Sequence, residues 1–188
     1  MEEALKKLPA ECKVTVDWMP FFLDPTAPLP GVNKLEHYNK KFGKGRVESM
    51  VPYMKDQGAK VGIKFSYGGK VGNTLDSHRL VELAKTKGKT DQCIEKLMSY
   101  YFEQEKDISD KKVLLQAATE IGIDAKEVLE GDQYADTVKK EVENAYRMGI
   151  SGVPAFIINR SVSLSGAQET ETWEEVLSEL GYLDTPNK

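Results

Sequence analysis

Cysteine and histidine are scarce in this sequence, with two of each among 188 residues. Cys12 and Cys93 lie far apart, whereas a protein held together by disulfides carries more cysteines in a recognisable pattern. We therefore predict a reduced protein with two ordinary thiols, of the kind found inside cells. A structural zinc site needs four cysteine or histidine ligands, usually at short spacings, which this sequence does not offer, so we expect no metal site.

Long apolar runs and blocks of basic residues are absent as well. No apolar stretch approaches the roughly 20 residues that a membrane-spanning helix needs. The chain starts with Met1-Glu2-Glu3, whereas a secretory signal has basic residues followed by an apolar stretch. Basic residues are scattered, and the formal net charge is -4 at pH 7. We therefore expect a cytoplasmic protein that binds neither nucleic acid nor membranes.

The first thirty residues combine a short helix with a strand. Residues 2–8 have a helical pattern of leucines and lysines that Pro9 ends. Residues 14–18, Val-Thr-Val-Asp-Trp, are β-branched and aromatic, which predicts a strand. Three prolines between residues 24 and 31 exclude regular structure there.

A long helical block follows, from about residue 33 to residue 147. Ser109 and Asp110 are suited to cap a helix that ends at Gly122. Asp124 and Glu127 have the spacing of a capping box for a short second helix. A further helix is predicted over residues 134–147.

Strand-forming residues return near the C-terminal end. Residues 155–158 and 162–164 predict two short strands joined by a turn at Asn159-Arg160, which makes a β-hairpin. Thr172 and Glu175 have the spacing of a capping box for a last helix. Without the helical block, the predicted order is helix, strand, helix, strand, strand, helix. This is the order of an α/β thioredoxin fold that lacks its first strand.

Three segments of the chain resemble one family. Residues 18–25, Trp-Met-Pro-Phe-Phe-Leu-Asp-Pro, resemble the second strand and exit loop of DsbA-like proteins of the FrnE type. Residues 72–80, Gly-Asn-Thr-Leu-Asp-Ser-His-Arg-Leu, resemble the start of a helix in the family's inserted helical domain. Residues 149–156 and 164–168 resemble its cis-proline loop, hairpin and final turn. Their order and spacing fit over nearly the whole chain.

The resemblance implies a thioredoxin-like fold with a large α-helical insertion. Residues 1–30 and 148–188 would form an incomplete thioredoxin-like domain, and residues 31–147 the inserted helical domain. Relatives of this type fall into two groups. One contains thiol-disulfide oxidoreductases with a Cys-x-x-Cys motif after the first strand. The other contains 2-hydroxychromene-2-carboxylate isomerase and kappa-class glutathione transferases, which use glutathione and carry a serine near that place.

The chain departs from both groups where the family's chemistry lies. Residue 1 aligns inside the family's first helix, so the resemblance places the first strand and the catalytic turn outside this chain. Neither Cys12 nor Cys93 matches a family catalytic position, so we assign no catalytic residue and expect no dithiol activity. The gap in the sheet leaves three possibilities open: a longer gene product, a strand lent by a second chain in a homo-oligomer, or closure by the remaining strands.

Two sets of residues are candidates for binding substrate. By the resemblance, Gly152, Val153 and Pro154 form a cis-proline loop that exposes the Val153 backbone to an extended peptide or to glutathione. The alternative is a tight turn that only ends the preceding loop.

The second candidate set opens a helix and consists of Asn73, Ser77, His78 and Arg79. These residues would line the cleft between the two subdomains and hold a polar or anionic ligand. The alternative is that Asn73 caps the helix together with Asp76 while His78 is satisfied inside the protein.

The sequence is therefore compatible with three functions. The first is a FrnE-type thiol-disulfide oxidoreductase family protein whose dithiol motif is absent from this chain. The second is a glutathione-dependent isomerase or transferase of the same fold. The third is a non-catalytic module that binds a peptide or a second subunit. No cofactor is required by these readings, although glutathione is a possible ligand.

Overall fold

The computed structural model describes residues 1–183 and divides the chain into two compact units. Of the described residues, unit 1 comprises 1–23 and 144–183, and unit 2 comprises Asp24–Glu143. The sequence suggested boundaries at residues 30 and 147. Because each unit has its own internal contacts, each is described by itself. No helix in the described part of the chain is both long enough and apolar enough to cross a bilayer.

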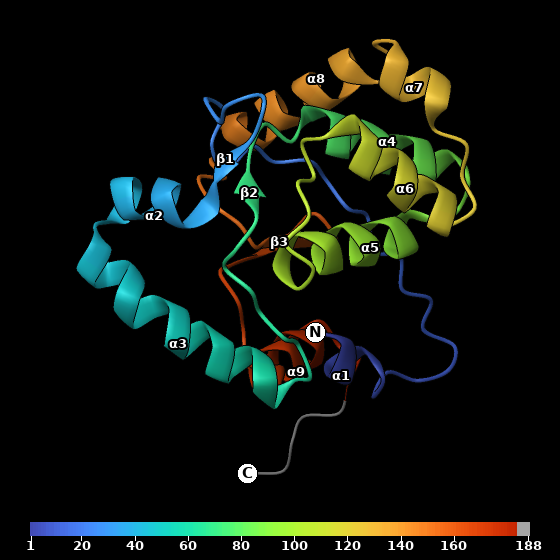
Figure 1. Cartoon of the computed structure of the whole chain (residues 1–188). Helices are drawn as coiled ribbons and strands as arrows, with labels where there is room; N and C mark the ends of the chain where they lie inside the picture. The colour runs from blue at the N-terminus through green and yellow to red at the C-terminus, as the bar shows by residue number, and fades with distance from the viewer. Residues whose placement is uncertain (184–188) are drawn as a thin grey trace. The chain divides into compact units, whose positions relative to one another are not determined.

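Unit 1 contains a short helix, a hairpin and a terminal helix. They are α1 (Glu2–Leu5), β3 (Ala155–Ile158), β4 (Val162–Ser165) and α9 (Thr170–Glu179). α1 and α9, at the blue and red ends of the colour scale, lie side by side in Figure 1. Ala4, Trp173 and Leu177 are buried between these elements, and apolar side chains of both strands pack against them. One face of the hairpin is thereby fixed to the helices.

The hairpin is the predicted one. β3 and β4 pair antiparallel with Phe156 opposite Leu164. Asn159 and Arg160 both have positive φ angles, 48° and 59°, and the Ser161 amide donates to the Ile158 carbonyl at 3.0 Å. Positive φ at both central residues is the requirement of a type I′ turn, whose twist suits a hairpin.

The predicted strand over residues 14–18 is wrong. These residues form neither helix nor strand, and the two sheets of the described chain are β3–β4 and a second pair in unit 2. Val14 and Val16 are 51% and 42% exposed. β-branched residues favour an extended backbone, but a strand exists only where another strand supplies the hydrogen bonds. No described strand does so here.

The core of unit 2 is a cluster of four helices. They are α4 (Leu75–Thr86), α5 (Thr90–Phe102), α6 (Lys111–Glu120) and α7 (Lys126–Glu130). α4 contacts each of the other three. Leu80, Leu114 and Leu129 are fully buried among them. α8 (Ala135–Arg147) follows, at the predicted residues, and the division between the units falls inside it.

Helix starts agree with the predicted caps in one case and differ in two. The Asp110 side chain caps α6 by accepting from the Lys112 amide at 2.8 Å. Ahead of α7, Asp124 accepts from the Lys126 amide at 3.1 Å, but Ala125 is the capping residue. α9 begins at Thr170, before the predicted capping box, and its cap makes no side-chain hydrogen bond. There the packing of Trp173, rather than a cap, determines where the helix lies.

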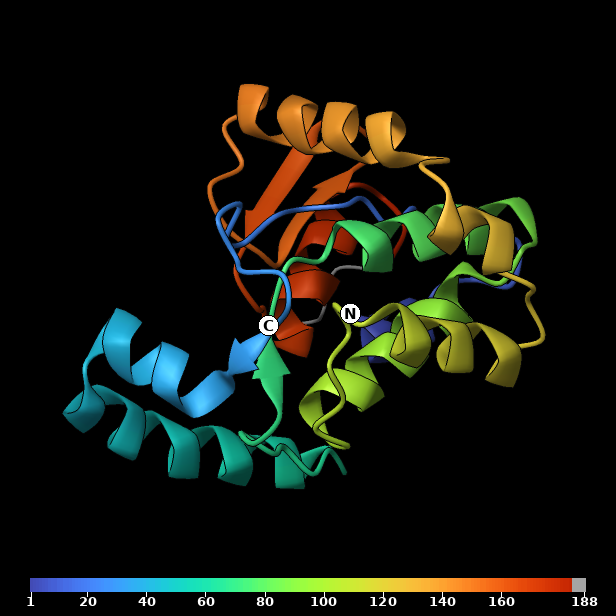
Figure 2. The same cartoon turned by 45° about the horizontal axis from the view of Figure 1, so that its top comes forward.

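Unit 2 also carries a pair of helices that stands beside the α4–α7 cluster. This arm consists of α2 (Lys34–Phe42) and α3 (Lys44–Lys60), which pack against each other (Figures 1 and 2). It is bounded by β1 (Val32–Asn33) and β2 (Lys70–Val71), which pair antiparallel. The sequence did not predict these two-residue strands because so short a segment has no recognisable alternation.

Candidate functional site

The loop before β3 ends at an exposed valine. Val153 is 51% exposed, and the Val153–Pro154 peptide bond is cis, as is Leu29–Pro30. The Pro154 carbonyl accepts a hydrogen bond from the Gly166 amide at 2.8 Å. This bond continues the β3–β4 pairing beyond the strand ends and fixes the loop to β4. The Val153 amide and carbonyl make no hydrogen bond to the described residues.

The register of the hairpin shows which side of β3 is open. Pro154 bonds toward β4, and the antiparallel pairing continues through Phe156 and Ile158. Because the backbone groups of successive strand residues point to alternate edges, those of Ala155 and Ile157 point away from β4. No described strand pairs with that edge. Val153, Ala155 and Ile157 together form what we call the β3 edge site.

The β3 edge site is kept in place because Phe156, on the other face of β3, packs against the core of unit 1. The Phe156 ring contacts the Trp173 ring edge to face, with centroids 4.7 Å apart. Trp173 is only 4% exposed. Ile157, whose side chain points to the other face, is 44% exposed. The site therefore combines open backbone groups with exposed apolar side chains on a strand that cannot rotate freely.

Ser77 and Asn73 make contacts inside unit 2. The Asn73 side chain accepts from the Leu75 amide at 2.9 Å, just before the start of α4. The Ser77 hydroxyl donates to the Ile108 carbonyl at 2.5 Å, and the residue is 4% exposed. His78 also has partners within the protein. Asn73 therefore holds the turn ahead of α4, but the capping residue is Thr74, which makes no side-chain hydrogen bond.

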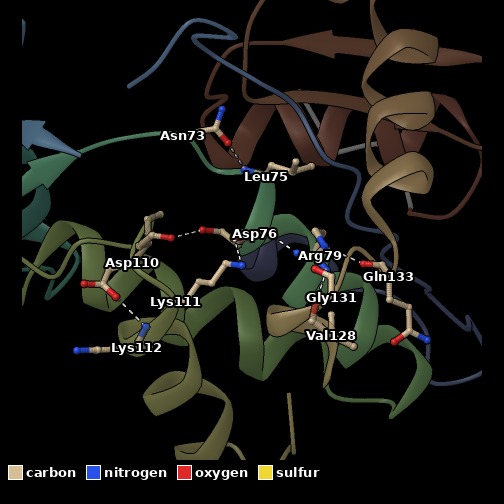
Figure 3. A network of polar contacts seen from close by, with 12 residues as sticks. Asn73, Leu75, Asp76, Arg79, Asp110, Lys111, Lys112, Val128, Gly131 and Gln133 are labelled. Atoms are coloured by element: carbon tan, nitrogen blue, oxygen red, sulfur yellow. Dashed lines mark hydrogen bonds and ion pairs between the residues drawn. The ribbon is translucent and has the colours of Figure 1, made fainter. Parts of the chain in front are cut away.

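Arg79 lies at the centre of a buried network (Figure 3). It is 3% exposed. Its Nε donates to the Gln133 carbonyl at 2.7 Å and its Nη1 to Asp76 at 2.6 Å. Its Nη2 donates to the carbonyls of Val128 and Gly131. The guanidinium thus ties α4 to the end of α7 and the loop after it.

The two candidate sets therefore differ in what they offer a ligand. The Val153 backbone is open, whereas the side chains of Ser77 and Arg79 already bond to the protein. Gly152 to Pro154 belong to unit 1, and Asn73, Ser77, His78 and Arg79 belong to unit 2. The proposed ligand-binding role of the second set stays a prediction. Ala155 and Ile157 were not predicted as site residues, although the hairpin turn indicates the register that exposes them.

The two thiols differ in burial. Cys93 is fully buried on α5, and burial raises its pKa to about 12. Only a thiolate attacks a disulfide, so this residue is unreactive at neutral pH. Cys12 is half-buried in unit 1 and, like Cys93, forms no disulfide. Among residues 1–183, no three histidine, cysteine or acidic side chains gather closely enough to hold a metal ion.

Comparison with known proteins identifies the family. The DSBA-like thioredoxin domain matches residues 1–178. A solved structure described as a "probable DsbA oxidoreductase", from Streptomyces coelicolor, matches with a TM-score of 0.87 and 29% identity. The match covers 100% of this chain and 84% of that one. No curated protein matches.

These similarities establish the α/β thioredoxin fold with a helical insertion that the sequence predicted. They also support the predicted relation to DsbA oxidoreductases. The family match covers nearly all of the described residues, from α1 to α9. The chain belongs to the family of DSBA-like thioredoxin domains.

Proposed function

We propose that this chain is a FrnE-type thiol-disulfide oxidoreductase family protein that holds an extended polypeptide at the β3 edge site. We further propose that the chain alone has no dithiol activity. The relation to oxidoreductases rests on the family match and on the name of the similar Streptomyces protein. The binding role rests on the geometry of β3.

The open backbone of the β3 edge site is the observation that carries this function. Ala155 and Ile157 direct amide and carbonyl groups to an edge that no described strand occupies. An extended polypeptide can add to such an edge by main-chain hydrogen bonds, and pockets or apolar surface beside it then select side chains. The exposed side chains of Val153 and Ile157 supply apolar surface there.

The absence of dithiol activity follows from the chemistry of exchange. A catalytic pair needs one thiolate to attack and a second thiol close by to release the mixed disulfide. The sequence contains no Cys-x-x-Cys. Cys93 is held as a neutral thiol by its burial. Cys12 alone has no neighbouring cysteine to resolve a mixed disulfide.

Proline substitution tests the binding role because it removes one backbone donor. Ala155→Pro deletes an amide that faces the open edge, whereas Ser163→Pro deletes an amide on the outer edge of β4. We expect Ala155→Pro to weaken binding of a fluorescently labelled unfolded polypeptide about tenfold and Ser163→Pro to leave it unchanged. Circular dichroism of both variants checks that the fold is retained.

The outcomes separate the three functions considered from the sequence. Equal affinity of both proline variants would refute binding at the β3 edge. Saturable binding of reduced glutathione in preference to the polypeptide would favour the isomerase and transferase relatives instead. Catalysis of disulfide reduction by the wild-type chain would refute the claim that it has no dithiol activity.

A further inference from the structure

Basic residues concentrate at the corner where α2 passes into α3. Residues 40–46 read Lys-Lys-Phe-Gly-Lys-Gly-Arg, with four cations and no acidic residue, although the whole chain has a formal net charge of -4. All seven residues are exposed. We call residues 40–46 the basic corner, because the segment is a local exception in an acidic protein.

The basic corner projects from unit 2. In both views it lies at the end of the arm furthest from the α4–α7 cluster (Figures 1 and 2). Gly43 has a φ angle of 83°, which glycine adopts without strain, and it is the one residue between the end of α2 and the start of α3. A side chain at Gly43 or at Gly45 would meet no other atom within 4 Å. The outer side of the corner is therefore uncovered.

Phe42 lies among the cations of the basic corner. It is 41% exposed, and its ring contacts the Tyr38 ring edge to face, with centroids 5.8 Å apart. The Lys41 Nζ lies 5.8 Å from the centre of the Phe42 ring, and the guanidinium carbon of Arg46 lies 6.0 Å from it. The corner thus presents one partly exposed apolar ring with two positive charges beside it.

Two of the four cations have no carboxylate partner. Lys40 and Arg46 form no ion pair with the described residues. The other two each lie within 4 Å of one carboxylate: the Lys41 Nζ is 3.5 Å from Asp24 and the Lys44 Nζ is 3.8 Å from Glu48. The second of these pairs is highly exposed, and such pairs are weak. The corner therefore keeps positive charge that is available to an anion from outside.

We propose that the basic corner binds the surface of a lipid bilayer that contains acidic phospholipids. Lys40 and Arg46 then face lipid phosphates, and the Phe42 ring enters the boundary between headgroups and acyl chains. Lysines and arginines beside an exposed aromatic ring are the composition of interfacial membrane anchors. Because the corner belongs to unit 2, it is separate from the β3 edge site, and the proposal does not depend on the proposed function.

The overall acidity of the chain led us to expect no membrane binding. Peripheral binding depends, however, on the charge of the surface that makes the contact. Electrostatic attraction to acidic lipids falls off within a Debye length, which is about 8–10 Å at physiological ionic strength. Four cations within seven consecutive residues reach one membrane surface together, whereas acidic groups elsewhere on the molecule are screened.

A single strand of nucleic acid is the other extended polyanion that a basic surface attracts. Proteins that bind single strands provide a charged groove along the backbone and several aromatic rings on which successive bases stack. The basic corner projects outward, and Phe42 is the one aromatic residue among residues 40–46. A flat anionic surface therefore fits the corner better than a strand does.

Cosedimentation of the full chain with lipid vesicles tests the proposal. We expect binding to vesicles of phosphatidylglycerol and phosphatidylcholine, none to pure phosphatidylcholine, and weaker binding as salt is added. Each lysine or arginine near an acidic membrane contributes about fivefold in affinity, so Lys40→Glu combined with Arg46→Glu should reduce it about 25-fold or more. Lys85→Glu combined with Lys87→Glu makes the same change in net charge at exposed residues outside the arm. This matched control should bind nearly as well as wild type.

A tryptophan at position 42 reports whether the ring enters the bilayer. We expect the emission of Phe42→Trp to shift to shorter wavelength on acidic vesicles and to be quenched by brominated lipid, in excess of any change in wild type, which has two tryptophans. Binding with no such shift would overturn the insertion of residue 42.

Two further results would overturn the proposal as a whole. One is the absence of binding to acidic vesicles in low salt, or an equal loss of affinity in both double variants. The other is binding of a single-stranded oligonucleotide through Lys40 and Arg46 without binding to vesicles, which would assign the basic corner to nucleic acid.

Discussion

Arg79 donates hydrogen bonds to four acceptors inside unit 2. Its guanidinium is buried, and each of its bonds to carbonyls or to Asp76 replaces a bond to water. The same contacts join two segments that are far apart along the chain, α4 and residues 128–133. Arginine is suited to joining segments in this way because its planar guanidinium carries several N–H donors in fixed directions, so that it can bond several acceptors at once.

Removing the Arg79 charge should destabilise unit 2. Arg79→Met keeps much of the apolar stem but leaves Asp76 and three carbonyl groups without their donor. We expect a loss of about 3 kcal/mol in the free energy of unfolding, measured by urea denaturation. Arg46→Met, at an exposed position, is the control and should change it by less than about 0.5 kcal/mol. Similar losses for both variants would contradict the role of the network.

Cys93 should resist alkylation in the folded protein. Burial raises its pKa to about 12, so the reactive thiolate is not populated near neutral pH. We expect iodoacetamide to leave Cys93 unmodified at pH 8 until urea unfolds the chain, as read by peptide mass spectrometry. Modification of Cys93 in the folded state would show that α5 opens readily.

The same thiol should make stability fall in alkaline solution. In the unfolded chain the thiol ionises from about pH 9, whereas in the folded chain it stays protonated to about pH 12. The folded state thus binds more protons over this window, and the free energy of unfolding decreases as pH rises through it. Comparing wild type with Cys93→Ala by urea denaturation isolates this contribution. Identical pH profiles for the two would contradict it.

At the scale of elements, the sequence predicted those structures that depend only on residues close together in the chain. The hairpin could be predicted because Asn159-Arg160 and two short apolar strands are adjacent in sequence. The cap of α6 is equally local. Residues 14–18 could not be judged locally, because whether they form a strand depends on a partner elsewhere. The β3 edge site was predictable only in part. Its loop was predicted from the sequence, but its open edge could be identified only from the pairing of β3 with β4 in the structure.

The Asp110 cap offers a test at this scale. Asp110→Ala removes the acceptor for the Lys112 amide and should cost about 1 kcal/mol of stability. Asp110→Asn keeps an acceptor at the same position and should cost much less. Urea denaturation of both variants measures the difference. Equal losses would mean that charge, rather than the hydrogen bond, accounts for the effect.

At the scale of the whole molecule, the two units have unequal cores. Unit 2 buries a large cluster across four helices, whereas the buried core cluster of unit 1 consists of Ala4, Trp173 and Leu177. Burial of apolar surface is the main favourable contribution to folding, so local opening should be easier in unit 1. Family membership could be predicted from motifs, but this imbalance could not, because it depends on which apolar residues are covered.

Hydrogen exchange measures this imbalance directly. We expect amides in the middle of α4 and α5 to exchange more slowly than those of β3, β4 and α9, by about tenfold or more. Mass spectrometry of peptides from exchanged protein resolves the elements without any substitution. Slower exchange in the hairpin than in α4 would contradict the expectation and indicate that unit 1 gains stability from an additional partner.

The hairpin turn also limits how the protein can change. With Phe156 fixed against Trp173, one extra residue between Ile158 and Val162 would offset β4 by one position and turn Leu164 from the core to solvent. The loop before β3 would then lose its anchor at Gly166. The length of this surface turn therefore limits which sequence changes the β3 edge site can tolerate. Among related sequences, insertions in the turn should be far rarer than substitutions.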